Sequence, residues 1–356
     1  MIFIPLLSHY IRMRVLQSWL MVMFVLLGLD AIFSFIDQLE NLKNDFQMFE
    51  AFVYVLSTLP ESAFEFVSMA MLLACLIGLG QLAENSELII LRASGISVSR
   101  ILWIVIQPVL LIILLTLLMA QYLIPVSSQF AESYRANKSG ETESSLLKKA
   151  YWQREGNQFI NINRIDSHGD LYGITIFDFN DQQQLVSVQS FKSATLKNDQ
   201  WQAKMVRTTI MDEQQISVSK EKSMRWETGI TFEMLKLLMV SPEKLSVTAL
   251  YKYGQYIEQQ EQNAAKYFLA FWAKVFLPVS TVAMVLIAAS FVFGSLRETP
   301  MGSRLLVGVV IALVFNQVQK LSSHAAIVYQ LDPVMAAAFP AVVALLIGLI
   351  LIGRTT

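Results

Sequence analysis

The composition of the chain is that of an integral membrane protein. It has 356 residues, of which 54% are hydrophobic and only 15% are charged, whereas roughly a quarter of the residues in a soluble domain are charged. The formal net charge of -1 leaves no basic surplus for binding the phosphates of a nucleic acid. Cys75 is the only cysteine, which excludes an internal disulfide and a cysteine-rich metal site.

Six stretches approach the length of about 20 apolar residues that a membrane-spanning helix needs. Five are clean apolar runs, at 15–35, 66–82, 101–123, 267–293 and 334–352. The sixth, 305–331, contains Asn316, Gln317, Gln319 and Lys320, so we expect a spanning helix with one polar end or face. The chain is therefore predicted to form an α-helical membrane protein with three spans on each side of a soluble insertion.

The insertion is predicted to be an all-β domain. Short runs rich in β-branched and aromatic residues occur at 157–163, 171–179, 185–188 and 201–207, separated by turn signals. Regular short strands of this kind indicate a sandwich, a barrel or a jelly roll. Ser246 is expected to cap a helix that runs past Tyr256 directly into the fourth span. We expect three parts, 1–126, 127–245 and 246–356.

The distribution of basic residues predicts the orientation, because cytoplasmic loops carry the excess of Lys and Arg. With the N-terminus in the cytoplasm, seven arginines near the helix ends lie inside and two lysines lie outside. The arginines are 12, 14, 92, 100, 297, 304 and 354, and the lysines are 43 and 320. Both termini are then cytoplasmic, and the β-domain lies on the far side of the membrane.

Motifs for several common chemistries are missing from the sequence. It contains no G-x-x-x-x-G-K-[ST], no G-x-S-x-G and no H-E-x-x-H, which are the motifs of nucleotide binding, serine hydrolysis and zinc proteolysis. We therefore expect no catalytic residue, metal or cofactor in this chain. If the protein is a pump, the ATPase is a separate chain.

Ionisable residues in the predicted spans are candidates for a polar lining or a lipid-headgroup site. Glu61, Glu65 and Lys320 lie near a predicted interface, where long side chains also extend into the headgroup region without any function. Asp30 and Lys274 lie deeper, where pairing between helices and substrate handling are equally open.

The loop between the second and third spans is predicted to contain a short cytoplasmic helix at 84–95. Asn85 or Ser86 can cap it, Glu87 favours its N-terminus and Gly95 can end it. Its four consecutive apolar residues, 88–91, are too many for a solvated loop, so the helix either lies on the membrane or docks in a partner. Glu87 and Arg92 favour a protein partner, and an interfacial or re-entrant connector is the alternative.

Several motifs resemble the permease family of the lipopolysaccharide-export ABC transporter, and specifically its G-type subunit. They are IDQL at 36–39, SELIILRASG at 86–95, SPEKLSVTAL at 241–250, FWAKVFLPVS at 271–280 and LRETPMGSR at 296–304. The resemblance covers the whole chain, and the motifs occur in the right order and on the predicted sides.

This resemblance implies a multi-pass subunit of the inner membrane of a Gram-negative bacterium, with a periplasmic β-jellyroll domain. The implied partners are a cytoplasmic ATPase dimer of the LptB type, a sister permease of the LptF type and a single-span periplasmic subunit of the LptC type that lies against the first span. The implied substrate is lipopolysaccharide or lipooligosaccharide, which is taken from the outer leaflet and passed to a periplasmic bridge of β-jellyroll domains.

The resemblance also implies roles for particular residues. Glu87, Leu88 and Leu91, with Arg92, belong to the helix that couples to the ATPase. Phe66 is placed as an apolar cavity residue and Arg135 as a basic residue for lipid phosphates, and we add Lys43, Asn316 and Lys320 as candidate lipid-binding residues. Several rim positions that are basic in relatives depart from this pattern, being Ser34, Glu40, Asn41, Glu61 and Glu132 here.

Two other functions remain as alternatives to transport of a glycolipid. A non-transporting receptor or scaffold would bind a periplasmic ligand on its β-domain, although six spans are more than a receptor needs. A permease for lipoproteins or peptides would place its large outer domain after the first span, whereas here it follows the third.

Overall fold

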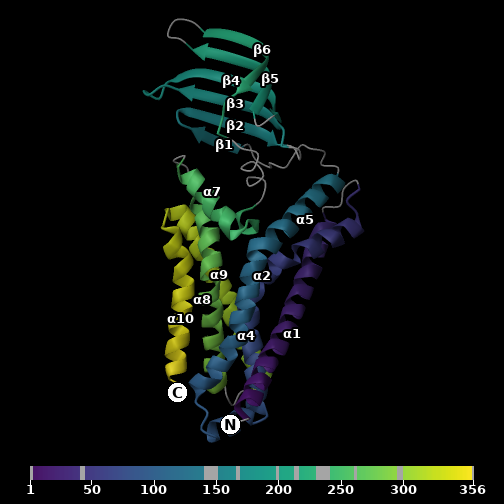
Figure 1. Ribbon diagram of the computed structural model, residues 1–356, viewed down its shortest axis with the longest axis vertical. Helices are drawn as coiled ribbons and strands as arrows, with labels where there is room; N and C mark the ends of the chain where they lie inside the picture. Colours follow the sequence, from purple (N-terminus) through teal and green to yellow (C-terminus); the bar gives the residue numbers. More distant parts are fainter. Residues whose placement is uncertain are drawn as a thin grey trace.

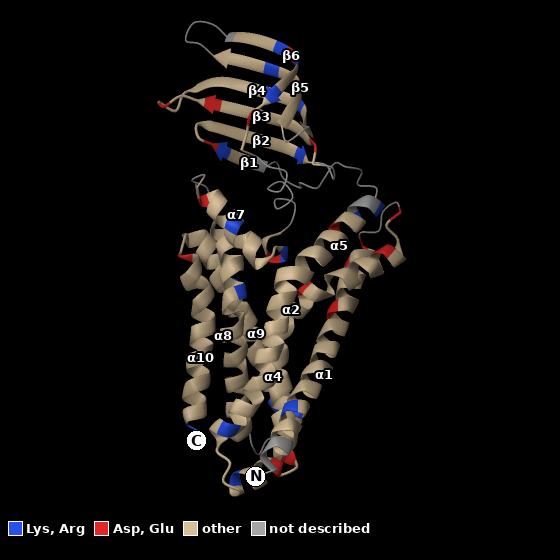
Figure 2. Cartoon of the chain, in the orientation of Figure 1, with Lys and Arg blue, Asp and Glu red and all other residues tan. Residues whose placement is uncertain are grey.

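A helical bundle and a β-sheet make up the computed structural model, with the sheet beyond the end of the bundle that lies opposite both termini (Figure 1). The structure describes residues 3–40, 45–139, 151–165, 169–197, 200–211, 216–229, 241–259, 263–294 and 300–354. Figure 2 shows charged residues mostly at the two ends of the bundle and on the sheet, with a largely uncharged middle.

Six helical stretches in the described chain are long and apolar enough to cross a membrane, as predicted. They are α1 (Phe3–Leu39), α2 (Met48–Glu84), α4 (Val98–Leu118) with its continuation, α8 (Ala265–Phe293), α9 (Met301–Tyr329) and α10 (Pro333–Gly353). Each apolar stretch identified in the sequence falls within one of them, apart from the last two residues of 305–331. The expected plan of three spans, an all-β insertion and three spans is confirmed.

The third span is longer and less regular than its apolar run. After α4 the chain forms a π-helical turn, η1 (Met119–Leu123), and continues as α5 (Ile124–Lys138), beyond the expected start of the inserted domain at residue 127. Within η1, Gln121 forms two hydrogen bonds with Thr248, at 2.8 Å through its Nε2 and 3.3 Å through its Oε1. These bonds tie the outer end of the third span to the chain that returns from the sheet.

Close helix contacts are made at two glycines in the second half of the bundle. A Cβ atom at Gly308 of α9 would lie 2.3 Å from Leu76 Cδ1 of α2, and one at Gly348 of α10 would lie 2.9 Å from Leu286 Cβ of α8. Glycine therefore permits both approaches, as small residues commonly do between helices in membranes.

The inserted domain is a six-stranded antiparallel sheet in which every strand pairs with its neighbour in the sequence. The strands are β1 (Tyr151–Glu155), β2 (Gln158–Ile165), β3 (Leu171–Phe179), β4 (Leu185–Lys197), β5 (Gln200–Met211) and β6 (Ile216–Trp226). Alternate residues such as Ile160, Ile162 and Ile174 are buried with Phe191 and Trp226 in one apolar cluster. The runs rich in β-branched and aromatic residues thus predicted β3 and parts of β2, β4 and β5, whereas β1 and the highly polar β6 were not predicted.

The return from the sheet to the membrane passes through η2 (Pro242–Lys244) and α7 (Val247–Gln259). Ser246 caps α7 as predicted, because its Oγ accepts a hydrogen bond of 3.2 Å from the Ala249 amide. The prediction that this helix runs directly into the fourth span is wrong. α7 ends at Gln259, and a separate helix, α8, begins at Ala265, whose amide donates a 2.9 Å hydrogen bond to Asn263 Oδ1.

Candidate functional site

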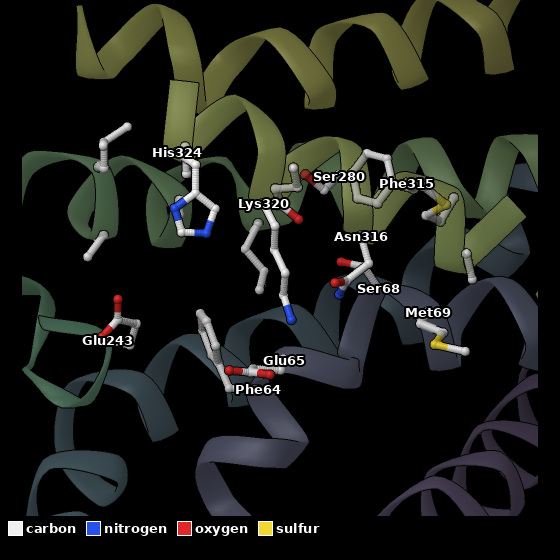
Figure 3. A pocket seen from close by; sticks show the side chains of 18 of the residues that line it. Phe64, Glu65, Ser68, Met69, Glu243, Ser280, Phe315, Asn316, Lys320 and His324 are labelled. Carbon is white, nitrogen blue, oxygen red and sulfur yellow. The ribbon is translucent and has the colours of Figure 1, made fainter. Parts of the chain in front are cut away.

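A cavity of about 490 Å³ lies between α2, α8 and α9, below η2. Its inner part is apolar, with Met69 on α2, Met284 on α8 and Phe315 on α9. Asn316, Ser68 and Ser280 lie beside these residues, and the charged or ionisable side chains Glu65, Lys320, His324 and Glu243 lie nearer the end of the bundle that carries the sheet (Figure 3). Figure 3 shows Glu65 of α2 and Lys320 of α9 extending from opposite walls into the same space. The cavity is therefore amphipathic along its length.

The five residues predicted to bind lipid do not converge on one place. Asn316 and Lys320 line this cavity, whereas Phe66 is half-buried and packs against the core of the bundle. Arg135 lies near the end of α5, with its guanidinium 5.5 Å from the ring centre of Tyr54 and 6.0 Å from that of Phe46. Lys43 lies outside the described residues.

An ionic cluster joins α2, α5 and the returning chain at the outer end of the bundle. Lys244 Nζ donates to Glu132 Oε1 at 2.9 Å and lies 3.7 Å from Glu61 Oε2. Tyr54 donates to the same Glu132 oxygen at 3.3 Å. Burial lowers the pKa of Lys244, but the carboxylates of Glu61 and Glu132 outweigh it and raise the pKa above its ordinary value. Two of the three acidic departures from the family pattern, Glu61 and Glu132, thus share one lysine of this chain.

Lys274, whose role the sequence left open, forms a hydrogen bond with a backbone carbonyl of this chain. Its side chain is only 3% exposed, and its Nζ donates a 2.6 Å hydrogen bond to the Leu245 carbonyl. The ammonium also lies 5.6 Å from the ring centre of Phe64. This hydrogen bond therefore links α8 to Leu245, the residue that follows η2, next to the cavity. Asp30, the other deep residue, lies half-buried on α1.

The predicted cytoplasmic helix forms as α3 (Glu87–Ala93), with Ser86 before it at a φ of 60° and without a side-chain capping bond. Leu88 is 4% exposed and belongs to the bundle core, against which Leu91 also packs. Ile89 and Ile90 are 45% and 62% exposed, and Arg92 is exposed as well. Of the predicted coupling residues, Leu88 and Leu91 therefore face this chain, and Arg92 faces outward.

Two contacts link α3 to the rest of the bundle. Glu87 Oε1 accepts a 3.3 Å hydrogen bond from the Tyr10 hydroxyl of α1. Leu88 lines a small depression together with Val292 and Phe293, the last residues of α8. α3 therefore lies against the first and fourth spans as well as against the second span that it follows.

The sheet is attached to α7 by a chain of polar contacts. Gln153 of β1 donates to Tyr256 of α7 at 3.1 Å and to Glu155 at 3.3 Å. Glu155 also accepts bonds from Thr228 and from the Gly229 amide. Burial raises the pKa of Glu155, although these two hydrogen bonds oppose the shift.

Sequence reasoning missed Lys244, and it named Ile89 and Ile90 only as part of the apolar run at 88–91. That run predicted a helix that lies on the membrane or docks in a partner, but it did not show that Leu88 and Leu91 pack against this chain while Ile89 and Ile90 are exposed. Lys244 had no local signal, because its carboxylate partners lie more than a hundred residues away along the chain.

Comparison with known proteins agrees with this architecture. A family model described as lipopolysaccharide export system permease LptF/LptG matches residues 9–354. The lipopolysaccharide export system permease protein LptG of Escherichia coli (strain K12) is 32% identical over 354 residues, which is 98% of both chains. LptG of Haemophilus influenzae (strain ATCC 51907 / DSM 11121 / KW20 / Rd) is 29% identical over 337 residues, 94% of both chains. The chain therefore belongs to the LptF/LptG family of lipopolysaccharide export permeases.

Proposed function

We propose that this chain is the permease subunit that receives lipopolysaccharide or lipooligosaccharide from the outer leaflet of the inner membrane. The amphipathic cavity between α2, α8 and α9 carries this proposal. Its apolar inner part, at Met69 and Met284, suits acyl chains, each buried CH₂ contributing about 0.8 kcal/mol. Its polar part nearer the sheet, at Lys320 and His324, suits a headgroup. The lipid is passed outward to a bridge of β-jellyroll domains.

The proposed orientation places both termini and α3 in the cytoplasm and the sheet in the periplasm. The excess of arginine near the ends of the spans supports it, and both termini lie at the bundle end opposite the sheet (Figure 1). We divide the chain into membrane helices at 1–126, the periplasmic domain at 127–245 and the connecting helix with three further spans at 246–356.

Energy for transport is supplied by an LptB-type ATPase dimer, which docks on α3. Ile89 and Ile90, which are exposed, contact the ATPase, with Arg92 beside them. Leu88 and Leu91 do not, because they pack in or against the core of the bundle. Glu87 holds α3 to α1 through Tyr10 and takes part in coupling. This chain is itself non-catalytic.

An LptF-type sister permease and an LptC-type single-span subunit cover the least buried spans. Only 11% of the apolar window of α1 and 17% of that of α9 is buried, against 67% for α2 and α8. Large apolar side chains such as Phe24 and Phe33 on α1 are more than half exposed. These two helices thus have apolar surface for partner helices or lipid.

A gentle detergent purification of the tagged chain, followed by mass spectrometry of retained proteins and lipids, tests the proposal. We expect a P-loop ATPase, a second permease and lipopolysaccharide or lipooligosaccharide. A variant with Ile90→Asp should lose the ATPase and keep the sister permease. Recovery of the chain alone with bulk phospholipid, under conditions that preserve other membrane complexes, would contradict the proposal.

A further inference from the structure

The strands β4, β5 and β6 carry a local excess of positive charge. They contain seven basic residues and one acid, Glu221, whereas the whole chain has 27 basic and 28 acidic residues. Figure 2 shows basic segments on β5 and β6. The basic side chains that are exposed are Lys192, Lys204, Arg207, Lys220, Lys222 and Arg225. The excess is therefore a feature of this part of the sheet and not of the overall composition.

The register of the sheet places Arg207 and Lys220 on the side opposite the apolar cluster, which we call the basic face. Phe191 and Val206 are buried in that cluster and are in register with Glu221, so the single acid belongs to a row on the other side. Successive side chains of a strand point to opposite faces. Arg207 and Lys220, which pair with each other in the neighbouring row, therefore lie on the basic face.

The basic face extends across the sheet from β2. Lys204 lies on it, because the preceding residue, Ala203, is buried in the apolar cluster. Lys204 is in register, through β4, with Tyr172 of β3 and Arg164 of β2. The Arg164 guanidinium lies 4.4 Å from the ring centre of Tyr172. Cations thus follow one another from β2 to β6, in the direction that leads away from the bundle (Figure 1).

The pairing of Arg207 with Lys220 indicates an anionic ligand. Side chains directly opposite each other in antiparallel strands have Cβ atoms about 5 Å apart, and like charges there destabilise a sheet. Both side chains are exposed, and neither forms an ion pair with a residue that the structure describes. The hairpins that join these strands, at 198–199 and 212–215, lie outside the described residues. A phosphate monoester carries about 1.5 to 2 negative charges, so one such group compensates both cations.

The position of the basic face excludes the headgroups of the surrounding membrane as the source of that phosphate. Neighbouring strands are about 4.8 Å apart, so β5 and β6 lie about 20 Å beyond β1. Figure 1 shows that β1 is the strand nearest the bundle. Electrostatic attraction is screened over about 8 Å at physiological ionic strength. The ligand must therefore itself extend away from the membrane.

We propose that the basic face binds phosphate groups on the saccharide part of the transported glycolipid. This inference rests on the proposed function, because it assigns a second contact to the same substrate. The saccharide extends from the membrane in the direction in which Arg164, Lys204 and Lys220 follow one another across the sheet. The large cavity of the bundle takes the lipid part, and the basic face holds the phosphorylated saccharide beyond it.

The test uses the full-length chain with its co-purifying partners in nanodiscs of phosphatidylcholine, and two matched probes. These are the phosphorylated core oligosaccharide released from lipopolysaccharide by mild acid, and the same oligosaccharide after its phosphates are removed. By titration calorimetry, wild type should prefer the phosphorylated form, with an affinity that falls as salt is added. Lys220→Glu should weaken this binding about fivefold, which equals about 1 kcal/mol for an exposed charge contact. Lys252→Glu, the same charge reversal at an exposed lysine of α7, should leave it unchanged.

Lys220→Glu also separates binding from folding. The new carboxylate lies opposite Arg207, and an opposite-charge pair at this position favours the sheet. The variant should therefore unfold at a temperature no lower than wild type while it binds the oligosaccharide more weakly. Lys204→Glu, whose neighbours in register are serines, is a second variant that should show the same loss of binding.

Three outcomes would overturn the proposal separately from the function on which it rests. The first is equal binding of the two oligosaccharides by wild type, and the second is an equal effect of Lys220→Glu and Lys252→Glu. The third is loss of a co-purifying protein, with unchanged oligosaccharide binding, in Lys220→Glu, which would assign the basic face to an acidic protein. Binding of lipid A by the same preparation, measured in parallel, would keep the proposed function in each case. Failure of wild type to bind lipid A would refute that function as well.

Discussion

The contact between α9 and α2 at Gly308 gives a prediction whose size follows from the packing. A Cβ atom there would lie 2.3 Å from Leu76 Cδ1 and 3.1 Å from Leu72 Cδ2, and both leucines are fully buried. An ordinary contact is about 3.4–4 Å, so α9 or the leucines must move by about 1 Å. Such overpacking costs about 1–3 kcal/mol, against a gain of about 1 kcal/mol for alanine over glycine in a helix.

Gly302→Ala, in the same helix, is the matched control, because its added Cβ meets no atom within 4 Å among the described residues outside its own helix backbone and its chain neighbours. The free energy of unfolding, measured by titration with SDS in detergent micelles, should therefore be lower for Gly308→Ala than for Gly302→Ala by about 1–3 kcal/mol. The displaced α9 should also alter lipid binding, since Ala312 and Asn316, one and two turns further on, line the large cavity. Equal stability of the two variants would refute the packing argument.

Three further predictions concern α3, the ionic cluster around Lys244 and the sheet. Leu88→Ala should lower the thermal stability of the chain, because it leaves a cavity at a buried site. Ile90→Asp should leave that stability unchanged and reduce co-purification of the ATPase. The reverse pattern would show that α3 presents its other face to the bundle. Lys244→Met should destabilise the chain by about 1–3 kcal/mol, because it leaves two carboxylates without their cation. In a double-mutant cycle measured by thermal unfolding, adding Glu132→Gln should restore part of this loss. Strictly additive effects of the two substitutions would argue against the ion pair of Lys244 and Glu132. The pKa of Glu155 is raised in the fold, so its contribution to the free energy of unfolding is present below about pH 4.5 and is lost as pH rises through the raised pKa. Glu155→Gln should remove this part of the pH dependence of the melting temperature. An unchanged pH profile in the variant would contradict the prediction.

The spans were predictable because hydropathy is a local property, but their ends were not. The apolar window at 66–82 gave only the inner part of α2, which begins at Met48 and passes through Pro60. Likewise, the polar sequence of α5 resembles the start of a soluble domain, yet contacts with α2 keep it helical to Lys138. Tertiary packing thus extends helices beyond what their own composition favours.

The candidate site was predictable where residues lie on one helix and not where distant segments meet. Asn316 and Lys320 interrupt an apolar run four residues apart, which places them on one face of a helix, and both line the cavity. The inward face of α3 depends on Phe293 at the far end of α8, and the ionic cluster depends on η2 returning beside α2. No local pattern contains either contact.

Photo-crosslinking from inside the large cavity tests the central claim most directly. A benzophenone amino acid at Asn316, which lines the cavity, would be compared with one at Leu349, which is half exposed on the outer surface of α10. In cells, we predict a lipopolysaccharide adduct from position 316, diminished by Ile90→Asp in α3, and little from position 349. Equal adducts from both positions, or none from position 316 in an assembled complex, would contradict the account.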